Sequence, residues 1–312
     1  MADSNSNEVL YDFPPMLRVY KDGRFERLWP IEFVPASVDP NTGVQSKDVE
    51  IAPEIGLSAR IYVPRNADPA KKLPVVVYFH GGGFVVESAF SPLYQKHLNA
   101  LVAEANVVAV SVNYRLAPEF HLPIAYEDSW IALKWVGSGL DKWIQDYADL
   151  GRVYLGGDSA GGNIVHNIAM RVGSENPDGI HLRGAFLNCP YFCGKDPLLN
   201  EETHELMPKS YLDNLWHYAC PSTNDCDDPL INPGMDSKLS GLGCKRVLVH
   251  VAEKDVLRGR GHLYKEVLEK SGWDGQVEIV DVKGKDHVFS VFFPDSESGL
   301  AMLKKVASFI NH

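Results

Sequence analysis

Short runs of consecutive apolar residues alternate, from residue 73 onward, with segments whose apolar side chains recur at helical spacing. The runs 75–79, 107–112 and 153–155 are solid rather than alternately polar, which is typical of strands buried on both faces. The segments 91–105 and 124–136 have the helical period. A chain with this alternation is restricted to a mostly parallel sheet covered by helices on both faces, the α/β class.

The same alternation continues towards the C-terminus. Further strands are predicted at 184–187, 247–251 and 277–282, and further helices at 257–270 and 300–310. No Gly/Ser-rich linker, Pro-rich run or internal repeat divides the 312 residues. We therefore expect residues 1–312 to form a single domain, with a sizeable core because 45% of the residues are hydrophobic.

Two stretches lie outside this alternation. Two antiparallel ribbons are predicted before the main core. One contains the Asp22-Gly23 turn within residues 18–28, and the other is formed by the segments 49–51 and 57–63. The region around residues 190–233 has an acidic start, a helical apolar pattern and a turn-rich end. Because ligands of open α/β sheets bind beyond the strand ends, we interpret this region as an inserted helical lid. A helix that only packs on the core is the alternative.

Charge and cysteine content bear on partners and compartment. The net charge of -11 disfavours nucleic acid and anionic membranes as partners, since both require a basic surface. No apolar run approaches membrane-spanning length, and residues 1–13 lack the basic and apolar regions of a signal peptide, so we expect a cytoplasmic protein. The five cysteines form no zinc-like pairs, so we expect reduced, mostly buried thiols and neither metal nor cofactor.

Residues 153–165 indicate a catalytic serine, because an apolar strand, a glycine-flanked turn and a helical pattern follow one another there. In Gly157-x-Ser159-x-Gly161, the small neighbours allow the serine to protrude at the tip of a strand-to-helix turn. The amide of Ala160, at the N-terminus of the helix, then points towards developing negative charge. A serine that only caps the helix is the alternative.

A serine hydroxyl needs a base to take its proton and a third group to hold that base. Of the eleven histidines, His287 lies in a loop just after the last apolar strand, from which a side chain can reach back over the sheet. His250 lies inside a strand and His166 lies on the helix after the serine, so we interpret both as structural. His287 is therefore the predicted base.

Asp255 is the predicted acid, because it follows the strand at 247–251 and so lies at the same edge of the sheet. Glu253 and Asp286 compete for this role. Glu253 is very close to the strand end, and Asp286 is the direct neighbour of His287, which is a poor geometry for holding the ring. The chain order serine, aspartate, histidine is that of α/β-hydrolases and differs from the orders in chymotrypsin and subtilisin.

An oxyanion hole is predicted directly after the strand at 75–79, in the segment His80-Gly81-Gly82-Gly83-Phe84. Three successive glycines leave backbone N–H groups unobstructed for the oxygen of a tetrahedral intermediate. A flexible loop or a phosphate cradle is the alternative. The lysine and hydroxyl residue of a P-loop are absent, and apolar residues follow instead.

These features resemble the hormone-sensitive-lipase-like α/β-hydrolases, and among them the plant carboxylesterases related to 2-hydroxyisoflavanone dehydratase and the gibberellin receptor. The resemblance covers nearly the whole chain and rests on residues 19–23, 80–84, 114–119, 157–163 and 271–273. It implies that Gly82, Gly83 and Ala160 supply the oxyanion amides. It also implies that the N-terminal segment joins the inserted helices in a cap.

The resemblance leaves the reaction open, because the family includes a hormone receptor, a dehydratase and cyclases. The receptor branch lacks the catalytic histidine, present here as His287, and the dehydratases generally carry threonine where this chain has Ser159. Cyclase-like members depart from the full triad. We therefore expect a serine carboxylesterase that acts through an acyl-enzyme; a dehydratase, lyase or cyclase of plant specialised metabolism is the alternative, and a non-catalytic receptor a remote one.

The substrate is expected to be a small apolar or aromatic ester. Phe84 and Val85 beside the oxyanion loop, with Tyr211, Leu215 and Trp216 in the inserted region, suggest an apolar pocket. Aromatic residues at helical spacing are more often ordinary core. Long-chain lipids are disfavoured, because the acidic chain shows no large apolar face for an interface. We expect a monomer or a weak homodimer.

Overall fold

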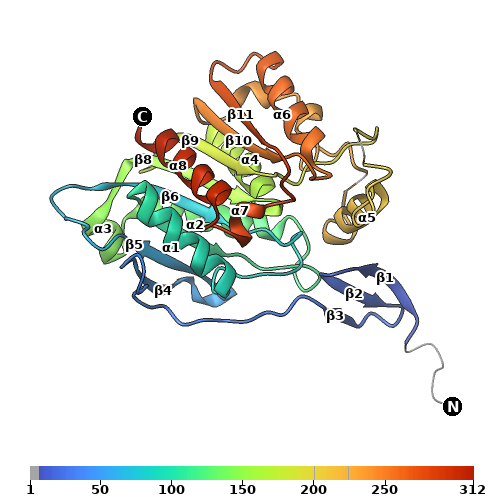
Figure 1. The fold of residues 1–312 in the computed structure, drawn as a ribbon, viewed down its shortest axis with the longest axis horizontal. Helices are drawn as coiled ribbons and strands as arrows, with labels where there is room; N and C mark the ends of the chain where they lie inside the picture. Colours follow the sequence, from blue (N-terminus) through green and yellow to red (C-terminus); the bar gives the residue numbers. More distant parts are fainter. Residues whose placement is uncertain (1–6, 200, 224) are drawn as a thin grey trace.

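The computed structural model describes residues 7–199, 201–223 and 225–312, and its centre is an eight-stranded sheet (Figure 1). In spatial order the strands are β11 (Gln276–Val282), β10 (Arg246–Ala252), β9 (Leu182–Asn188), β8 (Ala148–Asp158), β6 (Leu73–Phe79), β7 (Val108–Asn113), β5 (Leu57–Val63) and β4 (Gln45–Ala52). The strands from β11 to β7 run parallel, and β5 and β4 are antiparallel. The predicted mostly parallel sheet is confirmed.

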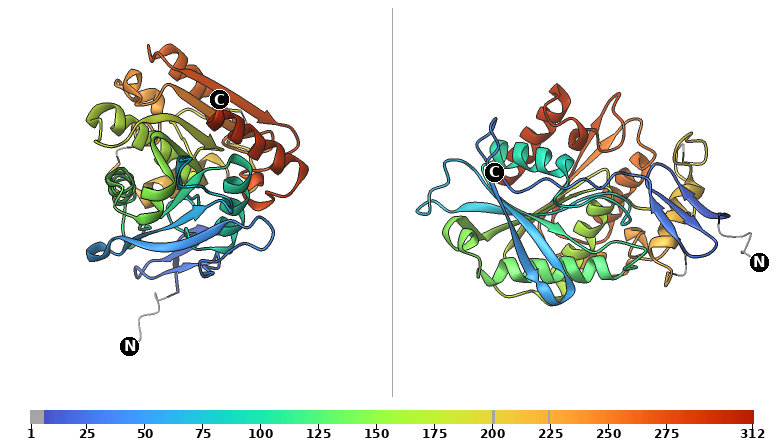
Figure 2. Two further views of the ribbon diagram at one scale, coloured as in Figure 1. Left: turned by 90° about the vertical axis from the view of Figure 1, so that its left-hand side faces the viewer. Right: turned by 90° about the horizontal axis from the view of Figure 1, so that it is seen from below.

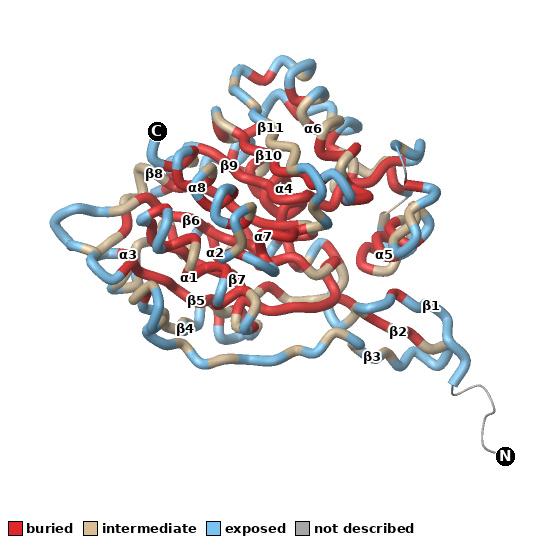
Figure 3. The backbone as a smooth tube through the Cα atoms, viewed as in Figure 1, coloured by how far each residue is buried: buried red, intermediate tan, exposed pale blue. Residues whose placement is uncertain are grey.

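Helices cover both faces of the sheet, because successive side chains of each strand point to opposite faces. In β6, Val75 and Val77 pack in one core cluster with α2 (Ile124–Ser138), α4 (Ala160–Glu175) and α6 (Arg258–Lys270). Val76 and Tyr78 pack in another cluster with α1 (Pro92–Ala105), α7 (Phe289–Phe292) and α8 (Glu297–Asn311). The buried strands run through the middle of the molecule in Figure 3. Two further helices are α3 (Lys142–Tyr147) and α5 (Lys209–Ala219).

A second, three-stranded antiparallel sheet is formed by β1 (Val9–Phe13), β2 (Leu17–Tyr20) and β3 (Phe25–Arg27). It lies at the same end of the molecule as α5 (Figures 1 and 2). The rings of Phe13 and Tyr211 meet edge to face at 5.7 Å, and the Tyr211 hydroxyl donates to the carbonyl of Pro14 at 3.1 Å. The N-terminal segment and the inserted region, far apart in sequence, are therefore in direct contact.

The structure differs from the sequence prediction in several elements. The ribbon predicted within 49–63 does not stand apart, because β5 pairs with β7 and so becomes part of the central sheet. Strand β8 begins at Ala148, well before the apolar run at 153, since its polar first half is still paired with β6 across a register shift. Helix α3 was not predicted, because six residues are too few to show a helical period.

Two expectations from composition bear on the compartment. All five cysteines are free and buried, as predicted. In the described part of the chain, no helix is both long and apolar enough to cross a membrane.

Short 3-10 helices occur at Pro53–Ile55, Pro233–Met235 and Leu239–Gly241. Residues 1–6, 200 and 224, which fall within the predicted N-terminal and inserted segments, lie outside the described residues.

Candidate active site

The segments that follow the parallel strands meet around one cavity of about 160 Å³. Gly82 follows β6, Ser159 follows β8, Tyr191 follows β9, Leu257 follows β10 and His287 follows β11, and all five residues line this cavity. Parallel strands bring their carboxyl ends to the same edge of a sheet, where ligands of open α/β folds bind. The site is therefore built by the topology rather than by any one element.

Ser159 occupies a sharp turn between β8 and α4. Its φ of 50° lies in the left-handed region, which is strained for a residue with a side chain. Its backbone is held by a hydrogen bond from its N–H to the carbonyl of Asn188 (2.9 Å) and by another from the N–H of Tyr191 to its own carbonyl (2.9 Å). A Cβ on Gly161 would lie 1.9 Å from the carbonyl oxygen of Phe79, so this turn requires glycine there.

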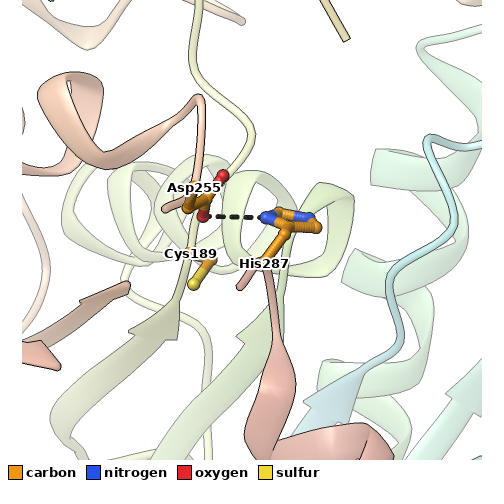
Figure 4. A group of neighbouring side chains, drawn as sticks. All are labelled: Cys189, Asp255 and His287. Atoms are coloured by element: carbon orange, nitrogen blue, oxygen red, sulfur yellow. Dashed lines mark hydrogen bonds and ion pairs between the residues drawn. The ribbon is translucent and has the colours of Figure 1, made fainter. Parts of the chain in front are cut away.

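The side chain of Ser159 does not cap helix α4, which weighs against the capping alternative. Its Oγ lies 3.0 Å from Nε2 of His287. On the other side of the ring, Nδ1 of His287 lies 2.8 Å from Oδ2 of Asp255 (Figure 4). The second oxygen of Asp255 accepts a hydrogen bond from the N–H of Leu257 at 2.9 Å. The structure thus brings together the three residues predicted as nucleophile, base and acid.

The charges of this group favour a basic imidazole. Burial opposes ionisation of Asp255, but the contact with His287 and the N–H of Leu257 outweigh it and lower the pKa of the carboxyl. Burial would likewise lower the pKa of His287, but the carboxylates of Asp255 and Asp158 outweigh it and raise that pKa above 6.5. An imidazole of this kind takes a proton from a hydroxyl and keeps it near a negative charge.

The competing acids and histidines have other partners. Glu253 is exposed, and its carboxylate accepts a hydrogen bond from the N–H of Gly284 at 2.7 Å, so it braces the loop that carries His287. Asp286 is exposed on the same loop. Burial lowers the pKa of both His166 and His250 to about 3, which keeps these rings neutral. Their burial fits the structural role predicted for them.

The glycine loop after β6 borders the cavity at Gly82 and Gly83, which have φ values of 100° and 61°. Among the described residues, the backbone N–H groups of Gly82, Gly83 and Ala160 have no hydrogen-bond acceptor. Ala160 is buried behind Ser159 and does not itself line the cavity. The carbonyl of Gly82 accepts from the N–H groups of Val85 and Val86 at 3.0 Å, so the loop turns back on itself.

Three of the five predicted pocket residues belong to the core instead. Tyr211 and Leu215 line the cavity, but Phe84, Val85 and Trp216 do not. The ring of Phe84 packs in a buried cluster with its centroid 6.3 Å from that of Trp216, and Phe84, Val85 and Trp216 are each at most 1% exposed. Neither nearness in sequence to the glycine loop nor helical spacing in the inserted region determines whether a side chain reaches the cavity.

Comparison with known proteins identifies the family. The family described as alpha/beta hydrolase fold matches residues 76–291 of this chain. The chain belongs to the α/β-hydrolases. Probable carboxylesterase 2 of Arabidopsis thaliana is 47% identical over 99% of this chain and 98% of its own, and 2-hydroxyisoflavanone dehydratase of Glycyrrhiza echinata is 44% identical over the same shares. The solved structure of a hyperthermophilic esterase from the archaeon Pyrobaculum calidifontis is 30% identical, with a TM-score of 0.74 over 85% of each chain.

Sequence reasoning missed most of the cavity wall of this α/β-hydrolase. Further wall residues come from the N-terminal segment, the loop after β6, helix α1, the inserted region and the segment around α7: Pro15, Met16, Trp29, Glu87, Leu93, Tyr94, Met207, Leu212, Val288, Val291 and Phe292. They lie far apart in the chain and share no local pattern. The position after β6 did offer a signal: Val86 was expected beside the pocket because it follows the glycine loop, and it lines the cavity together with its neighbour Glu87.

One group in this α/β-hydrolase has the side chains of a metal site. Ligand atoms of Cys189, Asp255 and His287 lie within 4.8 Å of one another (Figure 4). However, Asp255 and His287 already bind each other, and burial raises the pKa of the Cys189 thiol well above its ordinary value. A metal would need the thiolate, so the group does not suit a resident ion.

Proposed function

We propose that this chain is a serine carboxylesterase that hydrolyses small apolar or aromatic esters through an acyl-enzyme intermediate. The observation that carries the proposal is the continuous contact from Ser159 Oγ to His287 Nε2 (3.0 Å) and from His287 Nδ1 to Asp255 Oδ2 (2.8 Å), beside a cavity. The similar proteins named carboxylesterase and esterase support the same reaction.

The arrangement supports a two-step acyl transfer. His287 takes the proton of Ser159 as Oγ attacks the ester carbonyl, and the resulting oxyanion is stabilised by N–H groups of Gly82, Gly83 and Ala160. The tetrahedral intermediate collapses when the C–O bond to the alcohol breaks and His287 gives its proton to the leaving oxygen. Water then attacks the acyl-enzyme with His287 as base, which releases the acid and restores Ser159. Asp255 orients the ring and stabilises the imidazolium.

The size and lining of the cavity support a small substrate. Its volume of about 160 Å³ is close to that of the ~150 Å³ engineered cavity that binds benzene, so one aromatic ring or a short acyl chain fits. We assign its roof to a cap made of residues 7–29 and 190–233, which supply Met16, Trp29, Tyr211 and Leu215 to the wall. The remaining residues of the chain form the catalytic core of the same domain.

A lyase or dehydratase reaction is the second candidate, because 2-hydroxyisoflavanone dehydratase of Glycyrrhiza echinata is 44% identical. Such a reaction would use His287 to abstract a proton and the oxyanion amides to stabilise an enolate, without forming a bond to Ser159. Loss of the serine hydroxyl therefore distinguishes the two reactions.

The first prediction tests the nucleophile. Ser159→Ala lowers turnover of p-nitrophenyl acetate by at least about a thousandfold, because the residual rate comes from the oxyanion hole and binding alone. Ser296, whose hydroxyl caps helix α8, provides the matched control: Ser296→Ala leaves turnover unchanged. A phosphonate ester adds one adduct to the peptide containing Ser159, seen by mass spectrometry. Full activity of Ser159→Ala on a hydroxylated plant metabolite, without any adduct, would favour the lyase.

We place the enzyme in the cytosol, as a monomer or weak homodimer. The five buried free thiols fit a reducing compartment, and the net charge of -11 opposes self-association. Sedimentation of the purified protein across a concentration series measures the assembly state.

A further inference from the structure

The glycine loop of the oxyanion hole has no regular secondary structure, so side chains must hold it. The N–H of Gly81 donates to the hydroxyl of Tyr94 at 2.7 Å, and this hydroxyl donates to Oδ2 of Asp158 at 2.8 Å. Gly81 also lies close to Asp158 itself, because a Cβ on Gly81 would be 2.5 Å from the same carboxylate oxygen. The loop is thus linked through one tyrosine to the carboxylate that directly precedes Ser159 in sequence.

Asp158 is fixed in turn by its surroundings. It is 2% exposed, and its other oxygen accepts a hydrogen bond from the hydroxyl of Tyr78 at 2.8 Å. Burial raises the pKa of Asp158 to about 6, against the two tyrosine hydrogen bonds and the charge of His287, which lower it. The two tyrosine hydroxyls donate to the two different oxygens of Asp158, which is the arrangement that a carboxylate accepts.

We propose that Tyr94 is a positioning residue for ester hydrolysis, which transmits the orientation of the Asp158 carboxylate to the oxyanion loop through Gly81. This inference rests on the proposed esterase function and assigns Tyr94 no contact with the reacting atoms. A hydroxyl has one hydrogen. Because the carboxylate takes that hydrogen, the lone pairs of Tyr94 face the N–H of Gly81 and fix the direction of the peptide. The adjacent N–H groups of Gly82 and Gly83 then have a defined direction towards the cavity.

The other side of the loop is held in a comparable way. The hydroxyl of Tyr114 donates to the carbonyl of His80 at 2.7 Å, and Nδ1 of His80 contacts the carbonyl of Gly81 at 2.8 Å. These contacts fix carbonyl groups, whereas Tyr94 alone accepts from an amide of the loop among the described residues. Loss of its hydroxyl therefore releases the N–H side of the loop and leaves the N–H of Gly81 buried without an acceptor.

Tyr78 provides a matched control. Tyr78 and Tyr94 each donate one hydrogen bond of 2.8 Å to Asp158, and both hydroxyls are buried. Only Tyr94 also contacts the loop. The two substitutions Tyr78→Phe and Tyr94→Phe therefore each remove one hydrogen bond to the carboxylate, and only Tyr94→Phe also removes the bond to Gly81. Because Tyr94 lines the cavity and Tyr78 does not, KM is measured alongside kcat to detect an effect on substrate binding.

The experiment compares these variants with the full-length wild type on p-nitrophenyl acetate and with an aryl trifluoromethyl ketone as transition-state analogue. Tyr94→Phe lowers kcat by about tenfold or more and weakens inhibition by the ketone to a similar extent, with KM within twofold, because oxyanion donors act in the transition state. Tyr78→Phe changes kcat and inhibition by less than threefold. Thermal unfolding temperatures report whether the two variants lose comparable stability.

Equal effects of the two variants on kcat, or a change in KM alone for Tyr94→Phe, would overturn the inference. If Tyr94→Phe does not fold, Asp158→Asn replaces it, and its rates are compared on the pH plateau above the acid limb, because the Asp158 carboxylate also raises the pKa of His287. Asp158→Asn lowers kcat and the affinity for the ketone together if Asp158 orients the glycine loop through Tyr94. An unchanged affinity for the ketone contradicts the inference. The proposed function fails separately, if wild type does not hydrolyse the ester or Ser159→Ala retains activity.

Discussion

Asp255 and its two competitors show how a residue's role depends on what it can reach. All three acids follow strands or flank His287 in sequence, but only Asp255 combines burial with a 2.8 Å contact to the ring. Glu253 is instead bonded to the loop backbone, and Asp286 is exposed. Position in the sequence limited the candidates for the acid to these three carboxylates. Burial distinguishes them, because Asp255 is buried and the other two are exposed.

This difference gives a ranked prediction. Asp255→Asn lowers kcat by about 10⁴-fold, because the amide no longer holds the imidazole in the tautomer that accepts the proton from Ser159. Glu253→Gln and Asp286→Asn, which are the matched controls on the same surface, each change kcat by less than about tenfold. Steady-state kinetics on p-nitrophenyl acetate give the ranking, and a reversed order would assign the acid elsewhere.

The charge of Asp255 also sets the pH dependence. Burial alone would lower the pKa of His287, but the carboxylate raises it above 6.5. The base works in its neutral form, so kcat/KM of the wild type falls as the pH drops through that raised pKa. In Asp255→Asn the cause of the increase is gone, and the acid limb of the residual activity moves to lower pH. An acid limb that stays in place in the variant contradicts this account.

Where a motif and a strand end coincided, sequence reasoning selected residues that the fold brings into contact. Ser159, Asp255 and His287 each follow an apolar strand, and parallel topology then forces them to one edge. Phe84, assigned to the pocket from its place beside the glycine loop, and Trp216, assigned from helical spacing in the inserted region, fill the core instead. Which way a side chain leaves a turn depends on local φ, and the φ of 66° at Phe84 has no sequence signal.

At the scale of elements, the inserted region is attached to the core by a buried ion pair. Arg260 on α6 binds Glu201 through two hydrogen bonds of 2.6 Å, and it also donates to the carbonyls of Gly194 and Asp196. Both side chains are at most 4% exposed. Arg260 thus holds the start of the inserted region against the helix that follows Asp255.

Breaking this pair leaves the buried guanidinium of Arg260 without its counter-charge. Glu201→Ala lowers the free energy of unfolding by about 3–5 kcal/mol, because the Arg260 guanidinium stays desolvated. The control is Glu269→Ala, which removes an exposed partner of Lys265 on the same helix and costs less than about 1 kcal/mol. Urea unfolding monitored by circular dichroism measures both values. Equal losses would show that the buried pair adds nothing beyond an exposed one.

Element boundaries were less predictable than element types. Apolar runs located most of β6, β7 and β10, whereas the polar first half of β8 depends on backbone pairing with β6, which is distant in sequence. Hydrogen bonds between backbones leave no mark on composition. The contact between the N-terminal sheet and α5 is likewise visible only in the fold (Figure 2).

At the scale of the whole molecule, two segments far apart in the chain meet over the glycine loop beside the cavity. The N-terminal segment supplies Met16 and the inserted region supplies Leu215, and a Cβ on Gly83 would lie 3.3 Å from the Met16 sulfur and 2.9 Å from the Leu215 side chain. The two segments of the proposed cap therefore both lie directly against Gly83 of the glycine loop. Acyl chains must fit between this contact and Ser159 in a cavity of about 160 Å³.

The final prediction follows from this enclosure. Wild type prefers acetate and butyrate esters of p-nitrophenol to the decanoate by at least about tenfold in kcat/KM, because a longer chain would have to displace the cap. Met16→Ala removes part of the roof and shifts the optimum towards longer chains. Met170→Ala, a partly buried methionine of α4 that lies outside the cavity, is the control and leaves the length profile unchanged. A profile that Met16→Ala does not move would place the acyl chain on a different wall of the cavity, away from the N-terminal segment.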